Sequence, residues 1–394
     1  MTARKILFWI HLTAGVTAGV VILILSVTGI LLSFERQMKK CSDRAYKVSP
    51  RAERAGLGPI VVDARKSQGK LPTLVRESAD PTDPLELGFE GDFRMLIDPY
   101  TGAVLWQGRD PVYHFFSAVE AWHWWLGASG GSKSWQRNLT GAANFVFLIL
   151  LASGPFLWWR NLATWKRLKN AIWFRRNLAG RVRHLNWHDV AGGWCVAPLF
   201  VVSLTGVLMS YAWATNLLYR MTGTTPVSEG RLAADRGRQP GSVRQHDASA
   251  DFDWNTLDPL FVRAASQVTG WRTITLRLPL IRNAANFVIE TGGGGRPDQR
   301  SQLALNAQTG EVVRWESFST YNLGRRLRGW ARFAHNGEAA GIAGQILGLL
   351  ACLGSVLLVW SGLSLAIGRY LRWRTRSQTE EARELVEEEA SSPR

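Results

Sequence analysis

Histidine is the residue type through which this chain could do chemistry. The sequence holds seven histidines among 394 residues, and four of them lie within or shortly before long stretches that carry no charged side chain. The four histidines are His11, His123, His188 and His335, and the stretches are Ile6–Phe34, Leu139–Trp159, Val190–Leu218 and Ala339–Gly368. An imidazole inside or at the edge of a membrane span costs free energy, which makes it a candidate functional group. Two imidazoles on different helices at one depth can supply both axial nitrogens to a haem iron.

Position along the stretches sorts these histidines into two pairs. His11 and His188 lie near the starts of the first and third stretches, and His123 and His335 precede the second and fourth. Each is followed at position i+4 by a small residue, namely Gly15, Gly192, Gly127 and Ala339. On a helix the i+4 residue shares the histidine's face, so a small side chain there leaves space for a flat macrocycle. We therefore predict two bis-histidine haem sites, one held by His11 and His188 and the other by His123 and His335.

Other interpretations of these residues stay open. Zinc would need three or four clustered ligands, and neither Cys-x-x-Cys nor His-Glu-x-x-His occurs. Small residues also serve helix packing in membranes, and interfacial imidazoles can simply form hydrogen bonds. His184, one turn before His188, and His114, in the helical segment predicted at 113–125, are rival ligands, whereas His246 is expected in solvent. The basic residues before His335 could pair with haem propionates, bind an anionic substrate or lie on an exposed face; they are Arg325, Arg326, Arg328 and Arg332.

Four membrane helices are predicted to position the histidines. About 20 apolar residues span a bilayer core, and each uncharged stretch reaches that length. The 19 tryptophans and the net charge of +16 fit membrane interfaces and basic cytoplasmic loops. Net charge alone would also permit a nucleic-acid binder, but the chain holds neither a compact basic domain nor a binding motif of that class. The three cysteines form no disulfide framework, since Cys195 and Cys352 lie within spans and Cys41 stands alone.

Basic residues also predict the orientation. Arg4 and Lys5 precede the first span, the segment between the second and third spans is rich in arginine and lysine, and four arginines follow the fourth span closely. Cytoplasmic segments carry such an excess. Both termini are therefore predicted to be cytoplasmic, with two long segments on the other side of the membrane.

The two halves of the chain follow the same order. Placing His11 on His188 also places Gly29 on Gly206, at one offset of 177 residues and without a gap. Each outer segment shows one helix and four strands, with an (Asp/Asn)-x-x-Thr-Gly turn before the last strand. The predicted helices are 59–68 and 257–268, and the predicted strands are 73–77, 85–89, 94–97 and 103–107 in the first half and 273–277, 287–290, 302–305 and 311–315 in the second. Each half is thus predicted to be span, small α+β domain, span.

The ordered motifs resemble the PepSY-associated transmembrane family. They are His11-Leu-Thr-Ala-Gly15, Ser-x-Thr-Gly at 26–29 and 203–206, the two Thr-Gly turns and Leu157-Trp-Trp159, and the resemblance runs from about residue 4 to residue 370. It implies an α-helical membrane protein with four transmembrane helices, built from a duplicated helix–PepSY-like α+β domain–helix unit with two periplasmic α+β domains. Family members are often described as iron-regulated or iron-uptake membrane proteins. Within the family the chain is similar to the inner-membrane ferrisiderophore reductases, which carry b-type haem. The resemblance therefore implies that the two predicted haems are haem b.

The expected division of the chain follows from these spans and domains. In the first half, residues 1–36 are the first transmembrane helix, 37–112 the first periplasmic PepSY-like domain, and 113–160 the periplasmic lead-in and second transmembrane helix. Residues 161–187 are a basic cytoplasmic loop. In the second half, residues 188–218 are the third transmembrane helix, 219–322 the second periplasmic PepSY-like domain with a flexible insertion at 223–251, 323–368 the periplasmic lead-in and fourth transmembrane helix, and 369–394 the cytoplasmic tail.

The expected function is reduction of a ferric siderophore at the periplasmic face of a bacterial inner membrane, releasing Fe(II) for uptake. Haem carries the redox chemistry, and we see no catalytic acid, base or nucleophile. No flavin or nicotinamide motif is present, so the electron donor is left as a quinol or a cytoplasmic reductase. The main alternative is a non-enzymatic PepSY-type protein that binds a siderophore, peptide or protease partner. A secondary transporter is a weaker alternative, because the spans carry no broken helix or charge at the midplane.

Overall fold

The computed structural model describes residues 2–128, 134–158, 164–225, 252–281 and 283–391. The α-helices are α1 (Ala3–Leu32), α2 (Glu35–Asp43), α3 (Leu57–Gln68), α4 (Pro111–Trp125), α5 (Ser134–Trp158), α6 (Trp165–Ile172), α7 (Gly180–Ser210), α8 (Ala212–Met221), α10 (Leu257–Ser266), α11 (Leu323–His335) and α12 (Gly341–Ser391). The strands are β1 (Leu74–Ser78), β2 (Leu85–Gly88), β3 (Phe93–Ile97), β4 (Val104–Arg109), β5 (Thr273–Ile281), β6 (Ala284–Glu290), β7 (Arg300–Asn306) and β8 (Val312–Glu316). These elements confirm the helices and strands predicted for the outer segments. Residues 226–251, which make up most of the predicted insertion 223–251, lie outside the described residues.

Among the described residues, four helices are long and apolar enough to cross a membrane. They are Ala3–Tyr46, Trp135–Trp158, Gly180–Ser210 and Glu338–Glu380. Many of their large apolar side chains face outward, as expected of helices whose solvent is lipid, for example Val20, Phe156 and Leu347. The prediction of four membrane helices is confirmed.

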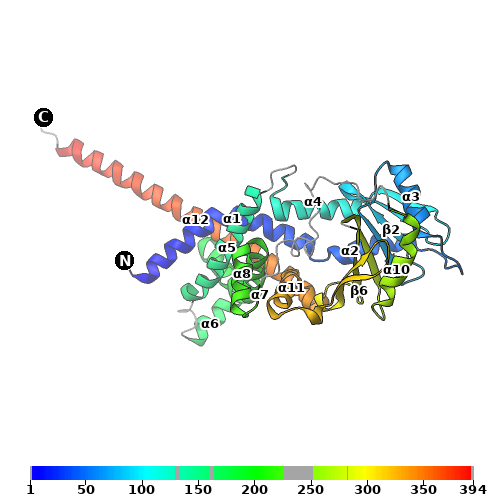
Figure 1. Ribbon diagram of the computed structural model, residues 1–394. Coiled ribbons are helices and arrows are strands. Elements are labelled where there is room, and N and C mark those ends of the chain that lie inside the picture. Colours follow the sequence, from blue (N-terminus) through cyan, green and yellow to red (C-terminus); the bar gives the residue numbers. More distant parts are fainter. Residues whose placement is uncertain (1, 129–133, 159–163, 226–251, 282, 392–394) are drawn as a thin grey trace.

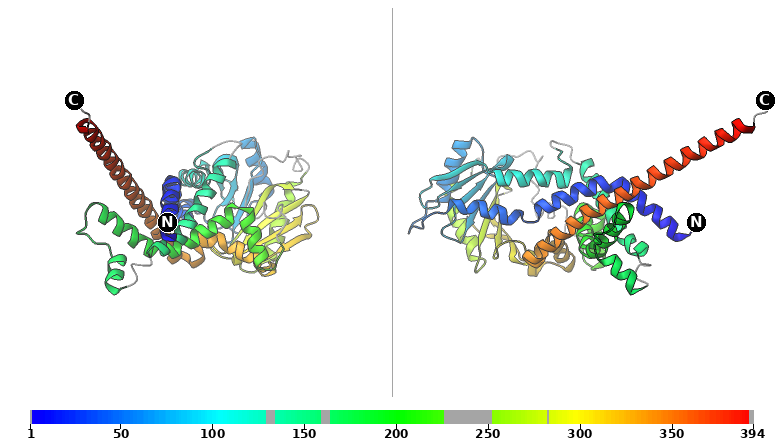
Figure 2. Two further views of the ribbon diagram at one scale, coloured as in Figure 1. Left: turned by 90° about the vertical axis from the view of Figure 1, so that its left-hand side faces the viewer. Right: turned by 180° about the vertical axis from the view of Figure 1, so that it is seen from behind.

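The four membrane helices form a bundle. α1 packs against α5 and α12, and α7 packs against the same two helices. The helices that carry His11 and His188 therefore stand diagonally across the bundle. Small residues permit the close contacts: an added Cβ on Gly19 would lie 3.5 Å from Leu363 Cδ2. Both chain ends lie at the end of the bundle away from the sheet, where α12 projects beyond the other helices (Figures 1 and 2).

The two outer segments share one sheet. Its eight antiparallel strands run in the order β4-β3-β2-β1-β5-β6-β7-β8, and β1 pairs with β5 from Leu74 opposite Arg277 to Ser78 opposite Thr273. The sequence predicted two separate α+β domains, and in this respect the expectation is wrong. Each segment alone would leave the long edge of β1 or β5 unpaired, and pairing the two edges removes that exposure.

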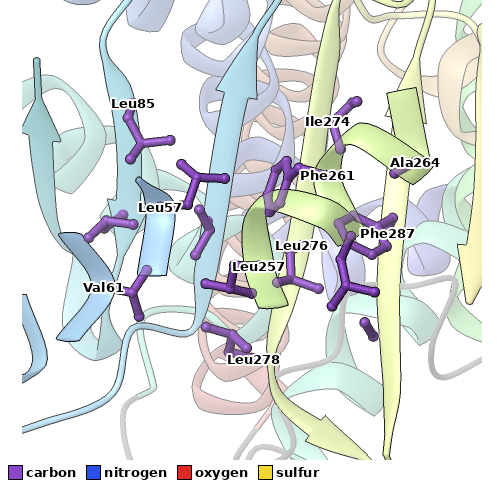
Figure 3. Close-up of a cluster of buried hydrophobic side chains, with 14 of the residues drawn as sticks. Leu57, Val61, Leu85, Leu257, Phe261, Ala264, Ile274, Leu276, Leu278 and Phe287 are labelled. Carbon is purple, nitrogen blue, oxygen red and sulfur yellow. The ribbon is translucent and has the colours of Figure 1, made fainter. Parts of the chain in front are cut away.

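One hydrophobic core lies between the sheet and the helices α3 and α10. Apolar side chains alternate along the strands, so that Val75, Ile274, Leu276 and Phe287 point to the same side. Figure 3 shows Ile274, Leu276 and Phe287 on the strands together with Leu57 and Val61 of α3 and Leu257 and Phe261 of α10. Asp258 on α10 accepts a hydrogen bond from the backbone N–H of Leu57 at 3.0 Å. The two segments thus fold around a single core. We call the sheet together with α3 and α10 the sheet domain.

The turn predicted in each half is present. The N–H of Gly102 donates to Asp98 O at 2.9 Å, and the N–H of Gly310 donates to Asn306 O at 2.9 Å. Both glycines have positive φ, 72° and 69°, which a residue with a Cβ rarely adopts. After each turn the chain passes through the edge strand, β4 or β8, toward a helix that runs to the membrane bundle, α4 or α11.

Candidate functional site

His123 and His335 meet at the end of the bundle nearest the sheet domain. His123 is near the end of α4 and His335 is the last residue of α11. Their ring centroids are 6.2 Å apart, with 67° between the ring planes. His123 Nδ1 lies 2.8 Å from the hydroxyl of Thr28 on α1. His335 Nδ1 donates to the carbonyl oxygen of Val202 on α7 at 2.9 Å and lies 3.3 Å from the hydroxyl of Thr205 on the same helix. Each histidine is therefore held by the membrane helix that opens its own half of the chain.

His11 and His188 are held in a matching way at the other end of the bundle. His11 Nδ1 lies 2.8 Å from the hydroxyl of Ser153 on α5, and His188 Nδ1 lies 3.1 Å from the hydroxyl of Ser361 on α12. The structure thus brings His123 and His335 together and holds His11 and His188 by matching contacts at the other end of the bundle.

The hydrogen bonds place the proton of each imidazole on Nδ1. Thr28 donates its hydroxyl proton to Ile24 O at 2.7 Å, so its oxygen must accept from His123. Ser361 likewise donates to Leu357 O at 2.6 Å and accepts from His188. For His335 the carbonyl oxygen of Val202, which can only accept, lies 2.9 Å from Nδ1 and gives the same result. Ser153 donates to Leu150 O at 3.1 Å, which leaves its oxygen to accept from His11. Because Nδ1 carries the proton, Nε2 carries the lone pair that a metal needs.

None of the four Nε2 atoms forms a hydrogen bond within the described part of the chain. Burial, and in second place the neighbouring His335, lowers the pKa of His123 to about 3, and burial also lowers the pKa of His335. Both imidazoles therefore stay neutral at physiological pH. A neutral imidazole with a bound Nδ1–H and a free Nε2 is the usual state of a metal-ligating histidine.

The spacing of His123 and His335 fits one metal ion between two imidazoles. The expected distance between the ring centroids is the sum of two metal–nitrogen bonds of about 2 Å and the distance from nitrogen to centroid in each ring, which is roughly 6 Å in total. The observed distance between the centroids is 6.2 Å. Within the described residues, no group of three or more His, Cys, Asp or Glu side chains gathers that could hold an ion by itself. A bis-imidazole pair without further protein ligands suits a haem iron, whose remaining ligands come from the porphyrin.

The small residues next to the histidines differ in part from the prediction. An added Cβ on Gly15 would meet nothing within 4 Å, whereas one on Gly192 would lie 3.6 Å from Leu358 Cδ2. Gly127 lies beyond the end of α4 with φ of 77°, so it does not share a helical face with His123, and its added Cβ would clash with Trp122 at 2.7 Å. Gly127 therefore terminates the helix. Ala339 likewise lies in a separate 3-10 turn, Glu338–Ala340, after the end of α11.

The rival histidines have different surroundings, and His184 Nδ1 is buried without a hydrogen-bond partner among the described residues. The His114 side chain is 60% exposed and lies 3.7 Å from the carboxylate of Asp92. The His184 ring packs edge to face on Trp360, with 4.8 Å between centroids. His246 lies outside the described residues. Of the basic cluster before His335, Arg325 is buried, bonds Glu316 at 2.7 Å and stacks on Tyr321, so it joins α11 to the sheet domain.

Comparison with known proteins identifies the chain. The family described as PepSY-associated TM region matches residues 8–369, which is nearly the whole chain. The chain belongs to this PepSY-associated transmembrane family. No curated protein matches it significantly. The resemblance drawn from the motifs is thereby confirmed, and the protein is a multi-pass membrane protein of this family.

The hydroxyls that contact the histidines of this PepSY-associated protein were not predicted from the sequence. Thr28 and Thr205 belong to the Ser-x-Thr-Gly motifs that carry the family resemblance, but their contact with His123 and His335 was not predicted. Ser153 and Ser361 each precede a glycine. An added Cβ on Gly154 would lie 4.0 Å from His11 Cε1, and one on Gly362 would lie 3.3 Å from His188 Cε1. The recurrence of Ser-Gly in the second and fourth spans was the signal available.

Proposed function

We propose that this PepSY-associated protein is a di-haem b-type electron-transfer protein that reduces ferric siderophores. The observation that carries the proposal is the set of four imidazoles whose Nδ1–H is bound by a hydroxyl or a backbone carbonyl of a membrane helix and whose Nε2 forms no hydrogen bond among the described residues. His11 and His188 would hold one haem, and His123 and His335 the other. When bound, haem supplies a one-electron carrier at each place.

The two sites would lie near opposite faces of a bacterial inner membrane. On α1, 17 residues separate His11 from Thr28, the partner of His123, and a rise of 1.5 Å per residue makes this about 25 Å. The same separation holds between His188 and Thr205 on α7. A hydrocarbon core is about 30 Å thick. With cytoplasmic termini, as the basic segments predict, the His11–His188 pair lies on the inner side and the sheet domain in the periplasm.

The matching contacts also support a duplicated architecture. The sheet is palindromic in strand order, with β1–β4 on one side of its centre and β5–β8 on the other. In each half-chain, a histidine on the first membrane helix contacts a serine on the second membrane helix. In each half-chain, a threonine on the first membrane helix contacts a histidine on the lead-in helix. We infer that each half is a span–PepSY-like segment–span unit, and that the two units share one sheet.

The electron balance is simple. One electron from a donor at the inner face, a quinol or a cytoplasmic reductase, reduces one chelated Fe(III) to Fe(II) at the outer face. A quinol gives two electrons and releases two protons, so it would serve two chelates. The hydrogen bonds at Nδ1 keep each imidazole in the ligating tautomer, and the sheet domain would present the substrate. Fe(II) is less charged than Fe(III) and is held more weakly by siderophore oxygens, so it is released.

The optical spectrum of the full-length protein tests the proposal. We expect a Soret band with the features of low-spin bis-histidine haem, two haems b per chain, and reoxidation of the reduced protein on addition of a ferric siderophore. A folded protein without bound haem would contradict the proposal and favour a non-enzymatic PepSY-type binding or regulatory role. A haem protein that ferric siderophores do not reoxidise would contradict the assigned substrate.

Removing one hydroxyl should weaken one site. Thr28→Val keeps the shape of the side chain but removes the acceptor for His123 Nδ1. Loss of such a partner lowers metal affinity by roughly 10–100-fold, so we expect easier loss of one haem to apo-myoglobin while the other is retained. Thr13→Val is the matched control, because Thr13 lies on the same helix and its hydroxyl bonds only backbone carbonyls of its own helix, at Trp9 and Ile10. Equal haem loss from the two variants would show that the Thr28 hydroxyl does not position His123.

A further inference from the structure

α11 turns one face toward the sheet domain. Arg325 bonds Glu316 of β8 at 2.7 Å, and Arg326 donates to Ser319 O at 2.5 Å. Figures 1 and 2 show α11 lying between the sheet and the membrane bundle. Two of the four arginines that precede His335 are therefore bonded on the sheet side of the helix.

The opposite face of α11 packs on the membrane bundle. His335, the last residue of the helix, donates to Val202 O of α7 at 2.9 Å, and Ala331, one turn earlier, is only 5% exposed. Residues three, four and seven positions apart share a face of a helix. Arg328 and Arg332 therefore lie on the face of α11 that carries His335.

Arg328 lacks a partner on this face. Its side chain is half-buried, and its Nε is buried without a hydrogen-bond partner among the described residues. The ion pairs that α11 and its neighbours form in that part of the chain do not include it. Leaving a buried guanidinium nitrogen unbonded costs free energy, which a bound anion would recover. Arg332, one turn nearer to His335, is exposed.

Two acids that border α11 are engaged by other arginines. Glu316, at the sheet end of the helix, bonds Arg325. Glu338, in the turn that follows the helix, lies 3.5 Å from Arg36 Nε, and its side chain is 11% exposed. Neither carboxylate is paired with Arg328, so neither neutralises its charge by direct contact.

Glu120 on α4 is the acid that interacts with Arg332. Glu120 stands three residues before His123, as Arg332 stands three residues before its own histidine. Burial raises the pKa of Glu120, and the neighbouring Glu35 adds to the rise, whereas the cations Lys39 and Arg332 oppose it. One carboxylate beside the two arginines of this face leaves a net positive charge near the outer histidine pair.

The distances along α11 suit the carboxylates of a haem. At 1.5 Å per residue, Arg328 is about 10 Å and Arg332 about 5 Å from His335 along the helix axis. Haem b carries two propionate groups in addition to the iron that the histidines would hold. Guanidinium groups bind carboxylates through paired hydrogen bonds, which are stronger than bonds between neutral groups. The charge and place of this face therefore match an anionic group that enters with the haem.

We propose that Arg328 and Arg332 form a carboxylate site beside the outer histidine pair, and that a propionate of the outer haem occupies it. The proposal rests on the proposed function for the haem. A carboxylate of a ferric chelate has the same chemistry and is the other source. The two arginines are positioning residues: they orient the haem through its propionate, and their charge favours reduced iron, because a nearby positive charge stabilises the form that has gained an electron.

Redox titration of the full-length, haem-bearing protein tests the site. Arg328→Gln should lower the equilibrium constant for reduction of one haem roughly tenfold, which is about 59 mV for one electron, and should leave the other haem unchanged. Arg328→Lys keeps the charge and should retain most of the potential, which a purely structural role of the guanidinium would not explain. Arg326→Gln is the matched control, because Arg326 lies on the sheet side of the same helix and donates to Ser319 O.

Equilibrium dialysis with ferric citrate separates the two sources of the carboxylate. With a propionate in the site, Arg328→Gln should change the potential and leave the affinity for ferric citrate unchanged. If instead the potential is unchanged and the affinity falls by roughly 10–100-fold, the carboxylate comes from the substrate and the propionate assignment is wrong. If neither measurement distinguishes Arg328→Gln from Arg326→Gln, the site itself is wrong while the haem proposal stands. A protein without haem would overturn the proposed function and the propionate assignment together, and ferric citrate binding would then decide whether the carboxylate site exists.

Discussion

Replacing His188 with alanine is expected to lower the haem content of the purified protein from two per chain to one. His188 is held by Ser361 on α12, and Gly362 leaves space beside its ring. An alanine at this position would remove one of the two proposed axial ligands of the inner site and leave His123 and His335 untouched. The pyridine-haemochrome yield per chain measures the effect, and the remaining Soret band should keep bis-histidine features.

The combination of variants separates ligation from a general loss of structure. His11→Ala should have the same effect as His188→Ala, and the double variant should lose no more than either, because both residues serve one iron. His188→Ala with His335→Ala should lose both haems. His184→Ala is the matched control, since His184 is one turn away on α7 and packs on Trp360. Retention of two haems by His188→Ala, or loss of haem from His184→Ala, would overturn the ligand assignment.

Replacing Arg94 with methionine should destabilise the attachment of the sheet domain to its helices by about 3–5 kcal/mol, the usual cost of breaking a buried ion pair from one side. The side chains of Arg94 and Asp110 are only 4% and 3% exposed, and they lie 3.3 Å apart. Arg94 also contacts Asp43 of α2 and stacks on Tyr113 of α4 at 3.8 Å. Without the guanidinium group, Asp110 is left buried with its charge uncompensated. Thermal unfolding of the full-length protein, followed by tryptophan fluorescence, should show a Tm lower by several degrees.

A double variant identifies the cause of that loss. Arg94→Met with Asp110→Asn removes the uncompensated charge and keeps a side chain that can cap α4, as Asp110 does by accepting from Val112 N at 2.8 Å. The double variant should therefore be more stable than Arg94→Met alone. Lys66→Met serves as the control, because its pair with Asp63 is exposed and such pairs contribute little. Equal Tm values for Arg94→Met and Lys66→Met would show that Arg94 does not anchor the helices.

The helices and strands could be predicted because their signals are local. The length of an apolar run decides whether it spans a bilayer, and alternation with a Thr-Gly turn marks a strand pair such as β3 and β4. The candidate ligands were found for a similar reason, since a histidine beside an uncharged run is costly and conspicuous. Gly127 was misinterpreted because the i+4 rule assumes that the helix continues, whereas α4 ends at Trp125.

The sequence by itself determined the four membrane helices, the family and the four histidines worth testing. Only the tertiary structure decided how the two outer segments combine, because β1 and β5 pair across nearly 200 residues of sequence and nothing local specifies that contact. The tertiary structure also decided which hydroxyl meets which imidazole, as in the bond between Thr28 and His123. Hydropathy and turn signals act within a few residues, whereas the tautomer of a histidine and the pairing of an arginine depend on groups that folding alone brings together.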